Sequence, residues 1–380
     1  MASAYVPGLQ GVVAARTRLS KVDGRKGELV LAGYALEEIA GRATFEEMAF
    51  LLWNDRLPNA RELDEFSAQL VSLRDLPVIT RQVLEAAAAQ KLPAIDALRM
   101  AAGTLSLRTD GEIVPEGAYR DVLVSVSRFA TIVASYGRLL AGDGPIAPHH
   151  RLSHAANYLY MLTGTRPSEA RTRALETYFN TVIDHGLNAS TFAARVIVST
   201  GSDVISAVVG AIGALKGPLH GGAPGPALEM VFEIGRAANA EPFMRAKLDR
   251  GERLMGFGHR VYKVRDPRAD VLSAAAEALF AADGDTELYE LAREVERVAL
   301  RLLDEYKPGR NLRTNVEFFT ALLLQGLGIP VDLFTPTFAV SRVAGWAAHC
   351  LEQLGANRII RPESEYAGES DRRWVPLERR

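Results

Sequence analysis

One pattern covers most of this chain. Between residues 44 and 355, apolar residues recur at helical spacing in segments that open on a capping residue and close on glycine or proline. Thr44 and Glu47 begin the first segment as a capping box, in which a hydroxyl and a carboxylate each satisfy a backbone N–H group of the first turn. Residues 27–34 alternate weakly, as a short strand or hairpin does. The sequence therefore predicts an all-α fold with minor β-structure at the N-terminus.

The individual helices follow from the same spacing and from stop signals. We predict helices that begin near residue 63 and residue 188, and others over 79–90, 94–107, 117–140, 153–163, 168–184, 203–215, 270–282, 286–305, 316–325 and 335–355. Residues 253–268 are predicted to form a loop with a short turn. Gly210 and Gly213 lie inside a predicted helix, where a glycine costs up to about 1 kcal/mol. We therefore expect a close helix–helix approach at these glycines, within the chain or at a subunit interface.

Composition narrows the classes of protein further. The chain has 380 residues, which fits one large domain and a smaller one. Its net charge is −2 and both signs are mixed along the chain, so the charge gives no indication of a nucleic-acid-binding surface. Cys350 is the single cysteine, so an intramolecular disulfide and a cysteine-based zinc site are excluded. No apolar run reaches the roughly 18 residues of a membrane helix, and the N-terminal residues lack a signal-peptide core, so we expect a cytoplasmic protein.

Two histidines stand in unusual surroundings. His220 lies in the letters GPLHGGA at 217–223 and His259 in GFGHRVYK at 256–263. Glycine lets a ligand or another backbone approach closely, and histidine transfers protons near neutral pH. Glu317 follows a predicted cap at Asn315, where the helix dipole favours an ionised carboxylate. We interpret these three as candidate acid–base residues, although a packed histidine and a helix-start glutamate fit the local patterns as well.

Cationic residues supply candidates for binding anions. Arg268, Arg342 and Arg361 lie beside apolar or proline-containing segments, and the planar fork of arginine matches a carboxylate. A structural ion pair would explain each of them equally well. Two basic clusters lie at turns with glycine or proline: Arg260, Lys263 and Arg265 at one, Lys307 and Arg310 at the other. Phosphate binding and a solvated charged face both remain open for these clusters.

Two other patterns are set aside. His149, His150 and His154 are close enough in sequence to suggest a metal site, but a solvated loop and a helix start explain them better, and we expect no metal. The letters GDGPIA at 142–147 match a dinucleotide-binding fingerprint formally. They follow a predicted helix rather than a strand and contain proline, so we reject a Rossmann turn.

Taken together, the motifs resemble the citrate synthase family. They are GLQGVVAA at 8–15, DH at 184–185, NAST at 188–191, GPLHGGA at 217–223, GFGHRVYK at 256–263, DPR at 266–268, LFTP at 333–336, SRVAGW at 341–346 and RP at 361–362. They occur in the order of the family and span nearly the whole chain. Any one of them would be a weak signal, whereas the ordered set is a strong one.

The resemblance implies an all-α homodimer whose chain folds into two domains. Residues 1–218 and 326–380 would form the large domain, and residues 219–325 a small, mobile domain that closes over the cleft and excludes water. The reaction implied is the condensation of an acyl-CoA, typically acetyl-CoA, with oxaloacetate or a related 2-oxo acid, followed by release of CoA. Coenzyme A would be a substrate, and no resident cofactor is implied.

The resemblance also implies a role for each candidate. Position 317 carries the base that takes a proton from the acyl methyl group, and His220 stabilises the resulting enol or enolate at the thioester oxygen. His259 and Arg268 would polarise the carbonyl of the oxo acid and hold its carboxylate. The remaining assignments complete two binding sites: His185 and Arg342 in the oxo-acid clamp, Arg361 in that clamp from the partner subunit, and Arg260, Lys263, Lys307 and Arg310 at the CoA phosphates.

The chain departs from the family pattern at the position of the catalytic base. The family reads PNVDF where this chain reads TNVEF at 314–318, so the base is a glutamate with about 1.5 Å of extra reach. A second departure is Ala32, where an arginine usually precedes the glycine. These changes leave three functions open: a citrate-forming enzyme, a 2-methylcitrate synthase that uses propionyl-CoA, and a low-activity homologue that binds CoA or an oxo acid as a regulatory protein.

Overall fold

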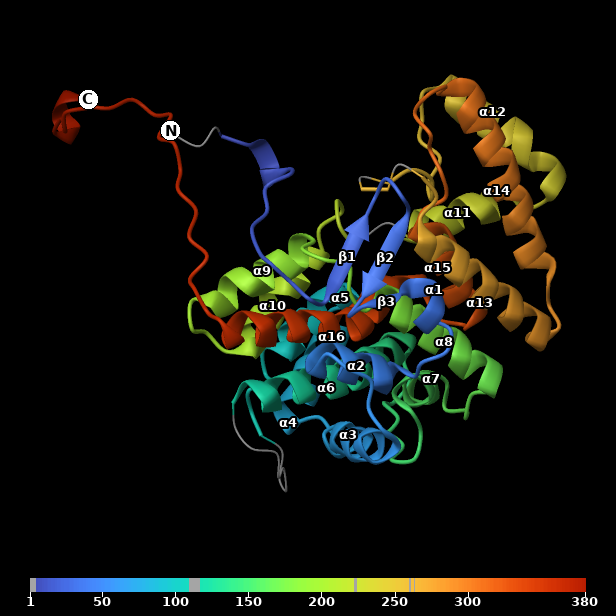
Figure 1. The fold of residues 1–380 in the computed structure, drawn as a ribbon, viewed down its shortest axis with the longest axis horizontal. Coiled ribbons are helices and arrows are strands. Elements are labelled where there is room, and N and C mark those ends of the chain that lie inside the picture. The colour runs from blue at the N-terminus through green and yellow to red at the C-terminus, as the bar shows by residue number, and fades with distance from the viewer. Residues whose placement is uncertain (1–4, 109–116, 222–223, 260, 263) are drawn as a thin grey trace.

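The structure is a computed structural model that describes residues 5–108, 117–221, 224–259, 261–262 and 264–380. Figure 1 shows a body of packed helices with a small sheet on one face. In chain order the helices and strands are β1 (Ser20–Asp23), β2 (Glu28–Leu31), β3 (Tyr34–Ala35), α1 (Leu36–Ile39), α2 (Phe45–Asn54), α3 (Ala60–Ser72), α4 (Val78–Ala89), α5 (Ala94–Ala102), α6 (Ala118–Ala141), α7 (His154–Thr163), α8 (Glu169–Val182), α9 (Ala189–Ser199), α10 (Val204–Leu215), α11 (Pro224–Ile234), α12 (Ala240–Asp249), α13 (Pro267–Asp283), α14 (Glu287–Tyr306), α15 (Val316–Gly326) and α16 (Phe334–Gly355). The prediction of an all-α fold with minor β-structure is confirmed.

The strands form one antiparallel sheet in the order β1-β2-β3. Ser20 pairs with Leu31 at one end of the first ladder, and Val30 pairs with Ala35 in the second. The tight turn between β2 and β3 passes through Ala32 and Gly33, both with positive φ. The weak alternation at 27–34 therefore does mark a hairpin, and the Ala32 departure lies in its turn.

Capping residues fix the starts of several helices as the sequence predicts. The Thr44 side chain accepts a hydrogen bond from the Glu47 amide, and the Glu47 carboxylate accepts one from the Thr44 amide at 2.7 Å. Ser168 and Asp203 accept hydrogen bonds from backbone amides at the starts of α8 and α10. Each such bond satisfies an amide that has no partner inside the helix, so these boundaries are set locally.

Other boundaries differ from the prediction. The segment predicted as a helix over 94–107 is helical only to Ala102 and continues as turns. The helix predicted from residue 270 starts earlier, because Asp266 accepts a hydrogen bond from the Arg268 amide and Pro267 occupies its first turn. The sequence analysis also missed α11 and α12, which cover much of the segment between the two histidines.

Helix α16 is the centre of the packing. It contacts α6, α8, α9 and α10, and its Trp346 and Arg342 are both fully buried or nearly so. At Gly345 the helix touches the end of α8 so closely that a Cβ atom would overlap the carbonyl oxygen of Ile183. Gly210 allows a similar approach of α10 to Ile197 of α9, whereas Gly213 faces open space. The predicted close approach is thus confirmed within the chain at Gly210 only.

A second group of helices, α11 to α15, lies to one side of this body (Figure 1). Two of its members, α13 and α15, pack on α8. This group corresponds to the small domain predicted at 219–325, and the division at those residues stays a prediction. Within the described ranges, no helix is long and apolar enough to cross a membrane.

The Gly345 contact generates a prediction about stability. We expect Gly345→Ala to lower the free energy of unfolding by about 1–3 kcal/mol, because the added methyl group must displace the backbone of Ile183. Gly355→Ala is the control at the end of the same helix, where a Cβ atom meets nothing within 4 Å. Its effect should stay within about 0.5 kcal/mol. Denaturant unfolding of the two variants measures the difference, and equal stabilities would contradict the close packing.

Candidate active site

The site is built on a pairing of two loops. The Gly258 amide donates to the Arg313 carbonyl at 2.7 Å, and the Asn315 amide donates to the Gly256 carbonyl at 3.0 Å. Phe257 and Thr314 form an antiparallel bridge between these bonds. His259 follows one loop directly, and Glu317 lies two residues beyond the other. The pairing therefore fixes the backbone that carries a candidate histidine relative to the backbone that carries the candidate base.

Asn315 contributes to this pairing with its side chain. Its Nδ2 donates to the carbonyl of Gly258 at 2.9 Å, and its side chain makes no capping hydrogen bond to α15. The predicted role of Asn315 as a side-chain cap is therefore wrong, although it does occupy the cap position. The amide is used instead to hold the histidine loop, because that loop lies within its reach.

Glycine is required in this loop for two physical reasons. Gly256 and Gly258 have φ values of +88° and +87°, which side chains rarely adopt. A Cβ atom at Gly256 would also lie 2.8 Å from Phe318 Cδ2, and one at Gly258 would lie 3.1 Å from Leu312 Cδ2. The glycines flanking His259 thus let the loop turn tightly against the start of α15.

The imidazole of His259 is oriented by the backbone. Its Nδ1 accepts hydrogen bonds from the amides of Val261 and Tyr262, both at 3.1 Å. These bonds assign the proton of a neutral ring to Nε2. Nε2 lies 3.3 Å from Arg268 Nη2. Two donor groups therefore lie side by side, and a carbonyl or carboxylate oxygen of a ligand could accept hydrogen bonds from both.

Arg268 is buried and held by its own helix cap. Its Nε and Nη2 donate to the two carboxylate oxygens of Asp266 at 3.0 and 2.8 Å. Burial alone would lower the pKa of Arg268, but the charge and hydrogen bonds of Asp266, together with the nearby Tyr262 and Glu317, raise that pKa above its usual value. The guanidinium thus stays charged beside His259 with part of its fork still available.

His185 and Arg342 lie on the other side of the same space. His185 Nε2 lies 3.1 Å from the Tyr262 hydroxyl, and its ring centroid lies 6.0 Å from that of His259. Burial, together with the charges of Arg268 and Arg342, lowers the pKa of His185 well below its usual value, so the ring is neutral. Arg342 Nε donates to the Val182 carbonyl at 2.6 Å. Burial lowers its pKa to about 10, which leaves it charged at neutral pH.

His220 approaches from the end of α10 and is half-buried. Its Nε2 lies 2.8 Å from the hydroxyl of Ser190, which also accepts a hydrogen bond from Trp346 Nε1 at 3.0 Å. Burial and the Arg342 charge lower the pKa of His220 to about 4. A neutral imidazole held by a serine can donate or accept at its other nitrogen, depending on where the serine proton lies.

Glu317 lies in the first turn of α15, as predicted. Burial raises the pKa of Glu317, and the charge of Arg268 opposes this effect. The residue is partly exposed, but its Oε2 atom is shut off from solvent, and no hydrogen bond reaches that atom from the part of the chain that the structure describes. A buried polar atom without a partner is costly, and at a base it is the atom free to take a proton.

The remaining predicted residues are not gathered here. Arg361 lies in the exposed segment after α16, and Lys307 and Arg310 lie in the exposed turn after α14. Arg260 and Lys263 lie outside the described residues. The structure thus brings together His185, His220, His259, Arg268, Glu317 and Arg342, but leaves the predicted CoA-phosphate residues and Arg361 untested.

The sequence analysis missed several supporting residues. Ser190, Trp346, Tyr262 and Asp266 all occur in the motif letters given above, yet no role was assigned to them. Asp266 holds Arg268, two residues away, but the partners of the other three are far away in sequence: Trp346 and Ser190 are 156 residues apart, and His185 and Tyr262 are 77 apart. Adjacent letters could not reveal such contacts.

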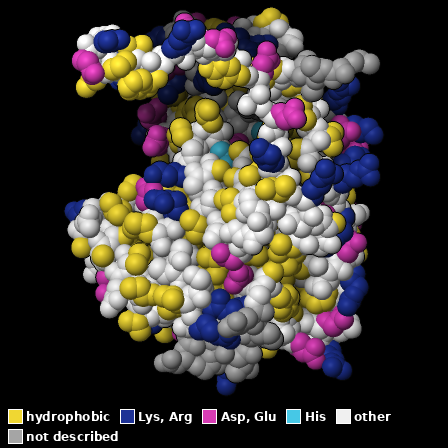
Figure 2. Space-filling view, turned by 90° about the vertical axis from the view of Figure 1, so that its left-hand side faces the viewer, with side chains coloured by type: hydrophobic (Ala, Val, Ile, Leu, Met, Phe, Trp, Pro, Cys, Tyr) yellow, Lys and Arg dark blue, Asp and Glu magenta, His cyan; other side chains and the backbone are white. Residues whose placement is uncertain are grey.

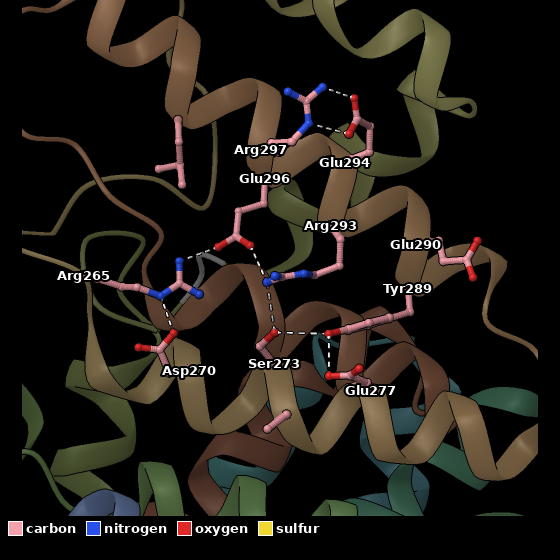
Figure 3. A pocket seen from close by; sticks show the side chains of 12 residues that line it. Arg265, Asp270, Ser273, Glu277, Tyr289, Glu290, Arg293, Glu294, Glu296 and Arg297 are labelled. Carbon is pink, nitrogen blue, oxygen red and sulfur yellow. Dashed lines mark hydrogen bonds and ion pairs between the residues drawn. The ribbon is translucent and has the colours of Figure 1, made fainter.

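A groove elsewhere on the molecule is lined by none of the gathered site residues. A groove of about 810 Å³ lies between α13 and α14, lined by charged residues and Tyr289 (Figure 3). Figure 2 shows histidine side chains in a recess of the surface. The candidate site is therefore recognised by its convergent groups rather than by its volume.

Metal binding finds no support in the described ranges, where no group of three or more metal-ligating side chains occurs. His150 is exposed in a loop, as expected. His154 starts helix α7, as expected, and its side chain is buried and stacks on Phe45 at 4.6 Å between ring centroids. Burial lowers its pKa to about 3.

A helical scaffold with neutral histidines, buried arginines and a free buried carboxylate defines an acid–base enzyme that handles an anionic substrate. Residues 8–363 match the family model of the citrate synthase C-terminal domain. A citrate synthase of Haloferax volcanii is 41% identical over 379 residues, with 98% of each chain covered. A 2-methylcitrate synthase of Mycobacterium tuberculosis is 39% identical, with 96% of this chain and 91% of that protein covered.

A solved structure extends the comparison. It is citrate synthase from Thermoplasma acidophilum in a ternary complex with carboxymethyl coenzyme A and oxaloacetate, with a TM-score of 0.86, 30% identity and 98% of each chain covered. The chain described here belongs to the citrate synthase family. It is accordingly an acyl-CoA condensing enzyme of the transferase class.

The pKa of His220 generates a prediction about pH. The usual histidine value is 6.5 and the folded value is about 4, so between these limits the unfolded chain binds more protons. Stability must therefore fall as the pH falls from 6.5 to 4. We expect the free energy of unfolding of His220→Gln to fall less than that of the wild type over this window. Denaturant titrations at several pH values measure it, and parallel curves would contradict the shift.

Proposed function

We propose that this protein joins acetyl-CoA, or a similar short acyl-CoA, to oxaloacetate and releases CoA. One observation carries the proposal: the buried, unpartnered Oε2 atom of Glu317 occurs in the same site as His220, His259 and Arg268. A carboxylate with a raised pKa is suited to take a proton from carbon, because its basicity is higher than that of an exposed glutamate.

The first step assigned to the site is enolisation. Glu317 takes a proton from the carbon next to the thioester, and the electron pair moves to the thioester oxygen. His220 stabilises this oxygen by donating a hydrogen bond, as a preorganised donor does for developing charge. Whether His220 can donate this hydrogen bond depends on where the hydroxyl proton of Ser190 lies. If Ser190 donates to His220 Nε2, the proton of the ring lies on Nδ1; Ser190 can instead donate to Asn188 Oδ1, 2.8 Å away. The proposal requires the first arrangement.

The second step is carbon–carbon bond formation. The enol carbon attacks the keto carbon of oxaloacetate, whose oxygen becomes an alkoxide that His259 Nε2–H and Arg268 stabilise. The buried charge of Arg342 and the neutral His185 would hold a carboxylate of the same substrate. The alkoxide takes up one proton, which balances the proton taken by Glu317, and water then cleaves the thioester and releases CoA together with the tricarboxylic acid. With acetyl-CoA this product is citrate, which would place the reaction in the tricarboxylic acid cycle.

The identity of the acyl group is left open by Glu317. The 2-methylcitrate synthase of M. tuberculosis, at 39% identity, supports propionyl-CoA as a second candidate donor. A low-activity homologue that binds CoA or an oxo acid for regulation is the third possibility, and only the longer base favours it. A misplacement of about 1 Å at a reacting atom can cost on the order of a hundredfold in rate.

Binding of CoA and closure of the site belong to the same proposal. Lys307 and Arg310, exposed in their turn, together with Arg260 and Lys263, would contact the CoA phosphates. CoA is then a substrate, and the reaction needs no resident cofactor. The small part of the chain, residues 219–325, would move over the substrates and exclude water. A cytoplasmic location belongs to the same proposal, and the single cysteine, which fits a reducing compartment, supports it.

We further propose a homodimer in which Arg361 completes the partner's oxo-acid site. The segment after α16 supports this, because it extends away from the helical body (Figure 1) and exposes large apolar side chains. Tyr366, Trp374 and Leu377 are 74%, 78% and 76% exposed. Apolar surface of this kind is typical of an interaction site, and Arg361 is exposed in the same segment.

Substitution of the base tests the reaction. We expect Glu317→Gln to lower kcat for CoA release by ~10²- to ~10⁴-fold with little change in KM, because the amide cannot accept the proton. Glu317→Asp shortens the reach and should lower kcat by ~10- to ~100-fold. Assays use oxaloacetate with acetyl-CoA or propionyl-CoA. Glu287→Gln, an exposed glutamate in the first turn of α14, is the control and should leave kcat unchanged.

Two outcomes would contradict an active condensing enzyme. If the wild type releases no CoA but Glu317→Asp does, the longer base disables the site and the regulatory homologue is favoured. If neither protein releases CoA although both bind oxaloacetate, the condensing reaction itself is wrong.

A mixing experiment tests the role of Arg361. Arg361→Ala and Glu317→Gln chains should each be inactive alone, but a mixed dimer keeps one intact site if Arg361 acts on its partner. Co-expression of the two variants should restore about a quarter of wild-type turnover, since about half of the dimers are mixed. Glu317→Gln with His220→Ala is the control, because both defects belong to the site of one chain and no mixed site is intact. No restoration in the first pair would place Arg361 elsewhere.

A further inference from the structure

Glu296 of α14 connects the two segments that carry the site. Its Oε1 atom accepts a hydrogen bond from the Thr314 hydroxyl at 2.6 Å and another from Arg265 Nη1 at 2.7 Å. Thr314 lies three residues before the base Glu317, and Arg265 lies three residues before the clamp residue Arg268. A single carboxylate therefore contacts both segments. In each segment the contacted residue lies three positions before the functional side chain.

The surroundings of Glu296 make this contact strong. The side chain is nearly buried, with 4% of the residue exposed, and its Oε2 atom accepts from Arg293 Nη1 at 2.8 Å. Figure 3 shows the carboxylate between Arg265 and Arg293, at the wall of the groove between α13 and α14. Hydrogen bonds to an ionised acceptor are shorter and stronger than neutral ones, and a buried group that loses its partner leaves the others unsatisfied.

Arg265 extends the same network to α13. Its Nε donates to the carboxylate of Asp270, and its Nη1 also lies 3.4 Å from the Thr314 hydroxyl. Asp266, the next residue, holds Arg268 through both carboxylate oxygens. The position of Glu296 is thus transmitted to the clamp arginine through a chain of adjacent residues, and to Glu317 through the first turn of α15.

Thr314 is the residue that makes this contact possible. Its backbone forms the bridge to Phe257. This bridge fixes the backbone position from which the Thr314 side chain projects. The family pattern PNVDF has proline at this place, and proline has no hydroxyl to donate. Thr314 therefore supplies an anchoring contact that a proline could not make, three residues before the base Glu317.

We propose that Glu296, acting through the Thr314 hydroxyl, is a positioning residue that sets the place of the Glu317 carboxylate. This inference rests on the proposed function of Glu317 as the base. Glu296 does not touch the reacting atoms. It fixes the start of α15, so that a glutamate with about 1.5 Å of extra reach ends at the position where a proton is taken.

Thr314 variants test the inference with the full-length enzyme. We expect Thr314→Val, which keeps the shape and removes the hydroxyl, to lower kcat for CoA release by ~10- to ~100-fold with the KM for oxaloacetate changed less than threefold. Thr314→Ser keeps a hydroxyl and should restore kcat to within about threefold of the wild type. Glu296→Gln should lower kcat similarly, and the double variant Thr314→Val/Glu296→Gln should be no slower than the slower single variant, because both remove one contact.

Glu294→Gln is the matched control. Glu294 lies on the same helix and wall of the groove, and its carboxylate pairs with Arg297 at 2.6 and 2.8 Å. It should leave kcat unchanged, since it contacts neither segment of the site. Thermal unfolding of each variant shows whether it is folded. If Glu296→Gln does not fold, the comparison of kcat between Thr314→Val and Thr314→Ser still tests the same contact.

The outcomes separate this inference from the proposed function. A wild type that releases no CoA overturns the function of Glu317, and the positioning role with it. An active wild type with full kcat in Thr314→Val overturns the positioning role alone. The same result follows if Thr314→Ser fails to restore kcat, if Glu294→Gln is as slow as Glu296→Gln, or if the two slow substitutions multiply their effects.

Discussion

The pairing of residues 256–258 with residues 313–315 is the contact on which the site depends. Three hydrogen bonds between these loops tie the backbone of His259 to that of Glu317. Neither loop belongs to a regular sheet, so the bonds exist only because Gly256 and Gly258 adopt positive φ and leave room for Phe318 and Leu312. A side chain at either glycine would separate the histidine from the carboxylate. The network around Glu296 then supports this pairing from the opposite side.

Burial determines the protonation of the site, and buried cations add to its effect. Burial lowers the pKa of His185 and of His220, the charge of Arg342 lowers both further, and the charge of Arg268 also lowers that of His185. The histidines are therefore neutral at physiological pH and can donate hydrogen bonds without carrying charge. Burial acts in the other direction on Glu317, whose pKa it raises. The same low-dielectric surroundings thus produce neutral donors and a more basic carboxylate, which is the combination that proton abstraction from carbon needs.

Much of the fold could be predicted because its signals are local. The capping box at Thr44 and Glu47 and the caps at Ser168 and Asp203 are contacts within one helical turn, so their letters are adjacent. Asn315 was assigned wrongly for the same reason: a cap-forming residue was read locally, while its amide reaches Gly258, 57 residues away in sequence. His154 does start a helix, as expected, but its stacking on Phe45 of α2 was not predicted. Both contacts join segments that are distant in sequence.

The sequence by itself determined the helical class, the N-terminal hairpin, the family resemblance and the list of candidate residues, because periodicity, caps and motif order are properties of short stretches of chain. Only the tertiary structure decided which candidates meet. It joined His185 to Tyr262, His220 to Ser190 and Trp346, and Thr314 to Glu296, and it left Glu317 Oε2 without a partner in the described ranges. The reason is physical: burial, charge proximity and hydrogen-bond geometry depend on distances in space, which packing of the helices sets and the order of residues does not.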